Sequence, residues 1–279
     1  MTEANMPPTP TATETVLAVE DLRTVFRTEG GELAAVDGVS FRLGRGEVVS
    51  IVGESGCGKS VMLKMFIGLL TPNEGAVYFK GQNLAEIDQP SLDAIRQQVG
   101  YVFQNDALFD SMTNLDNIGY SLREHSKTSD ESIRARALEC LKSVGLEERV
   151  LDLRPSNLSG GMRKRVGIAR AIAHKPEVLL YDEPTQGLDP QNITRIGELI
   201  SNLQRELSAT SVVVTHDMRT AFGVADRIAL MHDSHFPHVG TARELLHSDA
   251  PAVREFIEDA LEELEALPQL SAPAPLVPA

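Results

Sequence analysis

The chain has 279 residues, of which 42% are hydrophobic and 24% are charged, and its formal net charge is −14 at pH 7. This acidic balance argues against a nucleic-acid partner, because a surface that binds phosphate backbones needs an excess of Lys and Arg. The length suits one layered α/β domain, and the sequence contains no run of about 18 apolar residues that would predict a membrane-spanning helix.

Residues 1–15 are rich in Pro and Thr and lack both the basic and the apolar segment of a secretory signal. They predict a disordered arm on a cytoplasmic protein. The two cysteines, Cys57 and Cys140, are too few for a disulfide framework or a metal quartet, which is typical of a reducing compartment. The main domain is expected to span residues 16–245.

Residues 16–43 alternate apolar and polar side chains on either side of Gly30-Gly31, which predicts an N-terminal antiparallel β-subdomain. Further along the chain, short apolar runs alternate with stretches of helix length. These runs are residues 48–52, 99–103, 178–181, 212–215 and 228–231. Such alternation predicts an α/β fold whose parallel core sheet is covered on both faces.

Two segments depart from this alternation. Residues 113–150 are polar and helix-favouring, and they predict a helical insertion that extends with its flanks over about 105–170. Residues 246–279 are predicted to form a C-terminal helix followed by an extended Pro/Ala-rich tail. The helix has an apolar stripe that consists of Val253, Phe256, Ile257, Ala260, Leu261 and Leu264. This stripe either folds back on its own domain or packs on a partner subunit.

The first motif with a clear chemistry is "GESGCGKS", residues 53–60, which fits G-x-x-x-x-G-K-[ST] between a strand and a helix. Glycines let successive N–H groups point toward phosphate oxygens, and the new helix adds its positive end. The expected nucleotide-binding residues are Gly53, Glu54, Ser55, Gly56, Cys57, Gly58, Lys59, Ser60 and Val61. Lys59 would reach the β- and γ-phosphates of ATP, and the Ser60 hydroxyl would bind Mg²⁺.

Two adjacent acids, Asp182 and Glu183, follow the apolar run 178–181. Open α/β sheets bind ligands at the carboxyl ends of their strands, so these acids are expected to face the glycine loop. We assign Asp182 to Mg²⁺ and Glu183 to orienting and deprotonating the attacking water.

Further motifs resemble those of ATP-binding-cassette (ABC) ATPases: "LSGG" at 158–161, "GLDP" at 187–190, "VVVTHD" at 212–217 and Gln104 after "VGYVF". The resemblance covers residues 16–245 and implies a P-loop NTPase cassette. It implies that Gln104 is a catalytic residue and a ligand of Mg²⁺, and that His216 contacts the γ-phosphate and holds the geometry of Glu183 and the water. It further implies that Asp189 links two sites in a homodimer.

The resemblance also implies that one cassette is half of an enzyme. Ser159, Gly160 and Gly161 begin a helix whose N–H groups would face the γ-phosphate bound by the second copy. Adenine would stack on Phe26, although a core or turn aromatic explains that residue as well. Met162 stands where the family commonly has glutamine, and a thioether cannot donate the amide hydrogen bond.

The segments after Gln104, around Met162 and at 181–190 resemble the ATPases of Mla-type phospholipid transporters. That resemblance implies a peripheral location at the cytoplasmic face of the inner membrane. Its implied partners are an MlaE-like integral-membrane permease, an MCE substrate-binding protein and a small regulatory subunit. The alternatives are an amino-acid or peptide importer and a soluble ABC ATPase, such as one in iron–sulfur cluster assembly.

Leu108, Phe109 and Met112 closely follow Gln104. In the resembled family this part of the cassette receives a short helix of the permease, which makes the three side chains candidate contacts for it. They are equally consistent with the core of the helical insertion.

Overall fold

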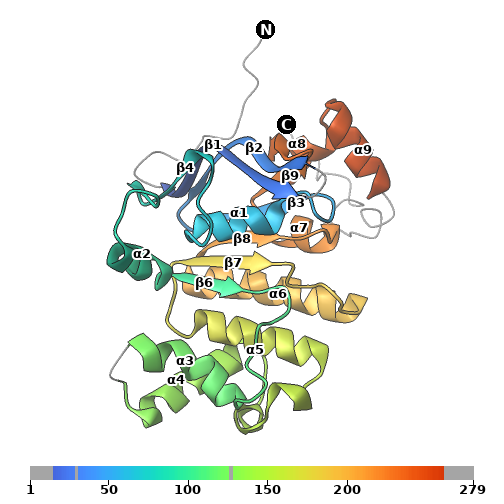
Figure 1. Cartoon of the computed structure of the whole chain (residues 1–279). Coiled ribbons are helices and arrows are strands. Elements are labelled where there is room, and N and C mark those ends of the chain that lie inside the picture. The colour runs from blue at the N-terminus through green and yellow to red at the C-terminus, as the bar shows by residue number, and fades with distance from the viewer. Residues whose placement is uncertain (1–14, 29–30, 126–127, 261–279) are drawn as a thin grey trace, which may run out of the picture.

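The computed structural model describes residues 15–28, 31–125 and 128–260. Within these ranges, two sheets are stacked with helices between them and beyond them (Figure 1). Residues 1–14 of the predicted arm 1–15, residues 261–279 and the turn residue Gly30 lie outside the described residues, whereas Thr15 is already part of the first strand. No helix in the described ranges is both long and apolar enough to cross a membrane.

The smaller sheet is antiparallel and has the strand order β2-β1-β4-β5. Its strands are β1 (Thr15–Thr28), β2 (Gly31–Gly44), β4 (Glu74–Phe79) and β5 (Gln82–Asn83). The predicted β1–β2 pairing is confirmed, with Phe26 opposite Leu33 near the end of the hairpin. Strands β4 and β5 were not predicted; they follow the first helix and add two strands to this hairpin.

The larger sheet has the order β10-β9-β3-β8-β7-β6. Its strands are β3 (Val48–Val52), β6 (Val99–Val102), β7 (Val178–Asp182), β8 (Thr210–Val214), β9 (Arg227–His232) and β10 (His235–Gly240). Five of them pair in parallel, as predicted, whereas the unforeseen β10 runs antiparallel to β9 at the edge.

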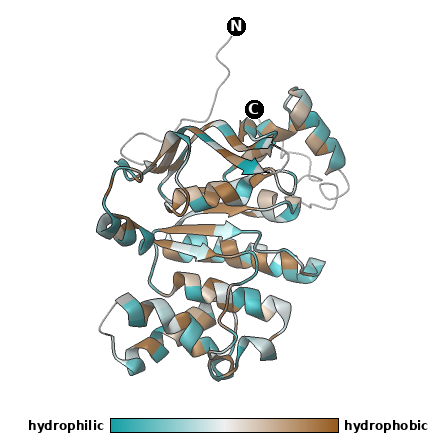
Figure 2. Ribbon diagram, in the orientation of Figure 1, coloured by the Kyte–Doolittle hydropathy of each residue, from teal (hydrophilic) through white to brown (hydrophobic). Residues whose placement is uncertain are grey.

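Each face of the larger sheet has its own apolar core, because successive side chains of a strand point to opposite faces. In β7, Leu180 packs into the core shared with the antiparallel sheet and α1 (Lys59–Phe66), while Leu179 and Tyr181 pack toward the opposite side. Figure 2 shows the apolar residues concentrated on these central strands and the hydrophilic residues on the outer helices. The prediction of a sheet covered on both faces is confirmed.

The remaining helices surround this sheet. They are α2 (Gln89–Arg96), α3 (Asn114–His125), α4 (Asp130–Ser143), α5 (Gly160–Ile172), α6 (Pro190–Leu207), α7 (Met218–Val224), α8 (Ala242–Leu246) and α9 (Pro251–Asp259), with 3-10 turns η1 (Glu148–Asp152) and η2 (Pro155–Asn157). Between β6 and β7, the described residues form helices and turns without a strand, as expected for a helical insertion (Figure 1). The limits of the predicted domains stay a prediction.

The described part of the C-terminal stripe packs on its own chain. Val253 in α9 is fully buried in a cluster with Met218, Leu230 and Leu245. Phe256, Ile257 and Ala260 lie partly buried against the same cluster. Leu261 and Leu264 are outside the described residues. The described part of the stripe therefore packs within the cassette.

Candidate functional site

The glycine loop, residues 53–60, joins the buried strand β3 to α1 and adopts backbone angles that favour glycine. Gly53, Gly56 and Gly58 have φ of 150°, 85° and 106°. A Cβ at Gly58 would lie 2.0 Å from the carbonyl oxygen of Ala35, and one at Gly53 would lie 2.2 Å from that of Met231. The loop is therefore seated directly against the backbone of β2 and β9.

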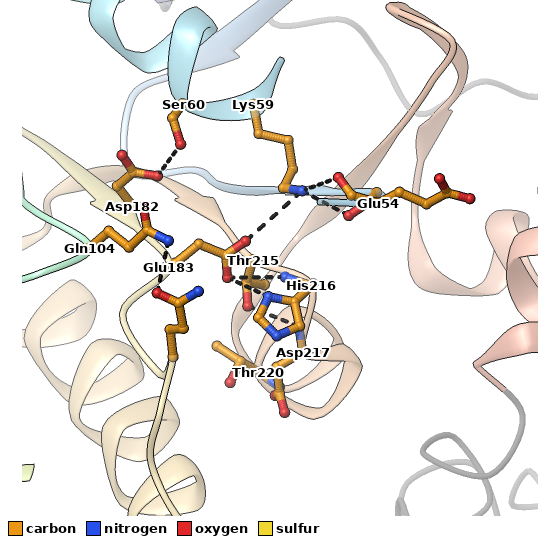
Figure 3. Close-up of polar contacts among 12 residues, drawn as sticks. Glu54, Lys59, Ser60, Gln104, Asp182, Glu183, Thr215, His216, Asp217 and Thr220 are labelled. Atoms are coloured by element: carbon orange, nitrogen blue, oxygen red, sulfur yellow. Dashed lines mark hydrogen bonds and ion pairs between the residues drawn. The ribbon is translucent and has the colours of Figure 1, made fainter. Parts of the chain in front are cut away.

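Lys59 is 5% exposed at the start of α1. Its ammonium group donates hydrogen bonds to the carbonyl oxygens of Gly53 and Glu54, each at 2.7 Å, and lies 3.9 Å from Oε1 of Glu183. The Glu54 side chain extends away from this group (Figure 3). Neighbouring Cys57 is partly buried, and this burial raises the pKa of its thiol although Lys59 opposes the effect.

Ser60 and Asp182 meet as the sequence predicts, although 122 positions separate them. The Ser60 hydroxyl donates to Oδ1 of Asp182 at 2.7 Å (Figure 3). A third member of this group, Tyr101 in β6, was not predicted; its hydroxyl donates to Oδ2 of Asp182 at 3.0 Å. Burial, and then the negative charge of Asp182, raise the pKa of Tyr101. A tyrosine inside an otherwise apolar strand was the available signal.

Glu183 follows β7 in the left-handed region, with φ of 47°, and it is 7% exposed. Its backbone N–H donates to the carbonyl oxygen of Val214 in β8. Oε2 of the carboxylate lies 2.8 Å from Nδ1 of His216 and 3.3 Å from its backbone nitrogen (Figure 3). The His216 ring is 56% exposed, so one edge fixes Glu183 while the rest faces solvent.

Lys59, Ser60, Glu183 and His216 line one cavity of about 450 Å³. Its lining combines the glycine loop with the ends of three strands. The lining residues are Ser55, Gly56, Gly58, Lys59, Ser60, Val61, Gln104, Glu183, Gln186 and His216. The four residues predicted to be catalytic, Lys59, Gln104, Glu183 and His216, are thus brought together.

Gln104 lies in the turn after β6, which ends at Val102, slightly earlier than predicted. Its side-chain amide donates to Oε1 of Gln186 at 2.8 Å, which links this turn to the segment after Glu183. The Gln104 carbonyl accepts a hydrogen bond from Lys164 in α5. Lys164 is buried and pairs with Asp106 at 3.2 Å. Gln186 and Lys164 were absent from the sequence prediction.

A second residue of α5, Arg170, binds the same turn. Its guanidinium donates hydrogen bonds to the carbonyl oxygens of Asp106 at 2.8 Å and Ala107 at 2.6 Å. Burial lowers the pKa of Arg170, although Asp106 opposes the effect. The backbone after Gln104 is therefore attached to α5 at several points.

The predicted signature turn, residues 158–161, begins α5 with Ser159 as N-cap, and Ser159 Oγ accepts the Met162 N–H at 3.3 Å. Gly160 lines a separate cavity of about 500 Å³, bounded also by the Gln104 turn and residues 186–188. The Met162 side chain is partly buried and packs against the apolar core below the larger sheet. Within one chain, the signature turn is therefore outside the lining of the glycine-loop cavity.

Asp189 and Phe26 also lie outside that lining. Asp189 is the N-cap of α6, and its carboxylate accepts hydrogen bonds from the backbone N–H and side-chain amide of Asn192, which lower its pKa. Phe26 is 38% exposed on β1. Their predicted roles at the nucleotide stay predictions.

The described residues contain no cluster of three or more His, Cys, Asp or Glu side chains that would hold a metal without other ligands. Mg²⁺ bound with a nucleotide takes only one or two protein oxygens, since phosphates and water complete its shell. The Ser60 and Asp182 oxygens, 2.7 Å apart at the start of α1, supply this donor set. The residues therefore fit Mg²⁺.

A glycine loop between a buried parallel strand and a helix, with paired acids two strands away in the sheet, defines a P-loop nucleotide triphosphatase. A family model described as ABC transporter matches residues 36–186. The chain therefore belongs to the ABC transporter family and carries its ATPase domain.

The chain is similar to proteins with different named substrates. It is 35% identical over 243 residues to "Methionine import ATP-binding protein MetN" of Cutibacterium acnes, covering 86% of this chain but only 66% of that protein. It is 34% identical over 245 residues to "Intermembrane phospholipid transport system ATP-binding protein MlaF" of Escherichia coli, covering 88% and 90%. The chain thus spans slightly less than two thirds of the length of the first relative.

A solved structure has the same fold. It is described as the dimeric structure of a post-hydrolysis state of the ATP-binding cassette MJ0796 bound to ADP and Pi. Its TM-score to this chain is 0.75 at 36% sequence identity, and the match covers 81% of this chain and 98% of that one.

Proposed function

We propose that this chain hydrolyses ATP to power an ABC transporter. The observation that carries the proposal is the convergence of Lys59, Ser60 and Glu183 with His216 on one cavity, together with the hydrogen bond of Ser60 to Asp182. A cation, a metal-binding pair and a held carboxylate are the groups that phosphoryl transfer to water requires.

In the proposed mechanism, the glycine loop and the N-terminus of α1 bind the β- and γ-phosphates through N–H groups. Lys59 exchanges its two carbonyl partners for phosphate oxygens. Ser60 and Asp182 would hold Mg²⁺, which neutralises developing phosphate charge when bound. Water then attacks the γ-phosphorus, and its proton passes to Glu183 as the bond to the ADP oxygen breaks. His216 keeps the Glu183 carboxylate in the accepting orientation.

We further propose that two copies complete the sites. The signature turn begins a helix, whose first N–H groups have no carbonyl partner within the helix, yet it does not line the glycine-loop cavity of its own chain. A head-to-tail homodimer would place it against the γ-phosphate held by the partner. Moving such a dimer from mostly open to mostly closed takes about 5.5 kcal/mol, or roughly 3 kcal/mol per ATP.

For the transported substrate, we propose phospholipid moved between membranes with an MCE-type system. The MlaF relative supports this because the match covers 90% of its length. Amino-acid import is the second candidate, which the similarity to MetN supports. In either case the chain would act at the cytoplasmic face of the inner membrane with an integral-membrane permease.

Purification in mild detergent with tagged chain, followed by mass spectrometry of bound proteins and lipids, tests the assignment. Recovery of a polytopic permease together with an MCE protein and phospholipid is the expected result. A permease accompanied by a soluble amino-acid receptor would replace phospholipid with the second candidate. Recovery of a soluble scaffold without a permease would contradict a transport role.

Phe109 is the best-placed residue for a permease contact. It is 44% exposed and its ring contacts that of Tyr120, which is 40% exposed, in a tilted arrangement with ring centroids 5.2 Å apart. Leu108, by contrast, packs against the core below the larger sheet. The Phe109–Tyr120 pair is thus an aromatic surface rather than core, next to the turn that carries Gln104.

Substituting Phe109→Asp should therefore lower transport strongly while basal ATP hydrolysis is kept. Leu69→Asp is the matched control, because Leu69 is 54% exposed in the turn after α1. Equal transport by wild type and a stable Phe109→Asp variant in proteoliposomes would remove Phe109 from the contact.

A further inference from the structure

Asp182 is 5% exposed, and each oxygen of its carboxylate accepts one hydroxyl. Ser60 in α1 donates to Oδ1 at 2.7 Å, and Tyr101 in β6 donates to Oδ2 at 3.0 Å. We propose that Tyr101 is a positioning residue for Mg²⁺ at this site, because its hydroxyl fixes the rotation of the Asp182 carboxylate so that Oδ1 faces Ser60. This inference rests on the proposed function as an Mg²⁺-dependent ATPase.

The carboxylate needs an external constraint. The last torsion of an aspartate side chain has a broad, roughly two-fold energy profile, so the residue itself does not fix the plane of its oxygens. A single donor on Oδ1 leaves rotation about that contact possible, whereas a second donor on Oδ2 from another element removes it. Hydrogen bonds to a charged carboxylate are stronger than those between neutral groups. Tyr101 therefore sets the orientation that Ser60 alone cannot.

The Tyr101 ring is itself held in place. Tyr101 is opposite Leu180 in the parallel pairing of β6 with β7, two positions before Asp182. Its ring packs against that of Phe103, with centroids 4.4 Å apart, and the guanidinium of Arg170 lies 5.9 Å from the Phe103 ring. The position of the Tyr101 hydroxyl is thus fixed by the contact of its ring with Phe103 and by the pairing of β6 with β7.

The strand next to β6 provides a matched control. Tyr181 directly precedes Asp182 and is fully buried, but its hydroxyl has no hydrogen-bond partner among the described residues. Both tyrosines lose the same single oxygen atom when phenylalanine replaces them. Only the loss at Tyr101 removes a donor from Asp182.

Binding of ADP, which the protein does not hydrolyse, is measured by calorimetry across a Mg²⁺ titration and separately in EDTA. In Tyr101→Phe, the Mg²⁺ concentration for half-maximal enhancement of ADP binding should rise about tenfold, since losing an outer partner of a metal ligand costs about 10- to 100-fold in metal affinity. ADP affinity in EDTA should change less than about twofold, because the phosphate contacts of the loop remain. Tyr181→Phe should titrate like the wild type.

A double-mutant cycle then tests whether Tyr101 acts through Asp182. In an Asp182→Asn background, removing the Tyr101 hydroxyl should produce little further shift of the Mg²⁺ titration. A full additional shift there, a wild-type titration for Tyr101→Phe, or an equal shift for Tyr181→Phe would each overturn the positioning role. Wild-type protein that binds ADP without any Mg²⁺ enhancement would instead contradict the proposed function.

Discussion

Replacing Glu183 by glutamine isolates proton transfer from nucleotide binding. Glutamine has the same shape and keeps an oxygen that accepts the His216 backbone N–H, which lies 3.3 Å from Oε2. Lys59 keeps its two carbonyl partners at 2.7 Å, so the site should stay assembled. The amide cannot take the proton of water, and loss of a general base lowers rates by about 100- to 10,000-fold, or about 2.7–5.5 kcal/mol of barrier.

Phosphate release measures turnover, filter binding measures ATP affinity, and light scattering after size exclusion measures the dimer. We expect Glu183→Gln to bind ATP like the wild type, to lose almost all turnover and to accumulate an ATP-bound dimer. Glu206→Gln in α6 is the control, because Glu206 is an exposed carboxylate. If Glu183→Gln retained more than about a tenth of the wild-type rate, Glu183 would not be the base.

Gly58→Ala should abolish nucleotide binding and lower the free energy of unfolding in urea by more than about 3 kcal/mol. The new Cβ would clash with the carbonyl oxygen of Ala35, and alanine would be strained at the positive φ of this position. Gly56→Ala, which has open space around it, should cost only about 1 kcal/mol, and equal losses would contradict this reasoning. Burial lowers the pKa of His238 below its usual 6.5, so near that pH the unfolded chain binds more protons than the folded one. The free energy of unfolding should therefore fall as the pH is lowered from 7 to 5, and it should fall less steeply in His238→Gln. Deleting residues 250–279 should lower Tm, and an unchanged dimerisation constant in sedimentation would exclude an interface role.

Local chemistry made the glycine loop, the paired acids and the parallel strands predictable. Gly53 and Gly58 occur where the backbone needs positive φ, and the apolar runs are long enough to indicate buried strands. Strand β10, by contrast, contains Pro237 and two histidines, which break the apolar pattern; proline is tolerated there because the strand is at the edge.

The missed site residues depend on contacts between distant parts of the chain. Tyr101 reaches Asp182 across 81 positions, and Lys164 reaches the Gln104 carbonyl across 60. In the sequence, Tyr101 is one more large residue in a strand, and Lys164 is one of several bases in an amphipathic helix. Only the register of β6 beside β7 and the packing of α5 against the Gln104 turn reveal what they bind.

Helix α5 couples two parts of the cassette mechanically. It starts at the signature turn, and it holds the turn after β6 through Lys164 and Arg170. Its 13 residues make a rod of about 20 Å, so a tilt of about 10° displaces one end relative to the other by about 3 Å. A displacement of the signature turn would therefore also shift the backbone around Gln104. The stiffness of α5 sets how closely the movement of the Gln104 turn matches that of the signature turn.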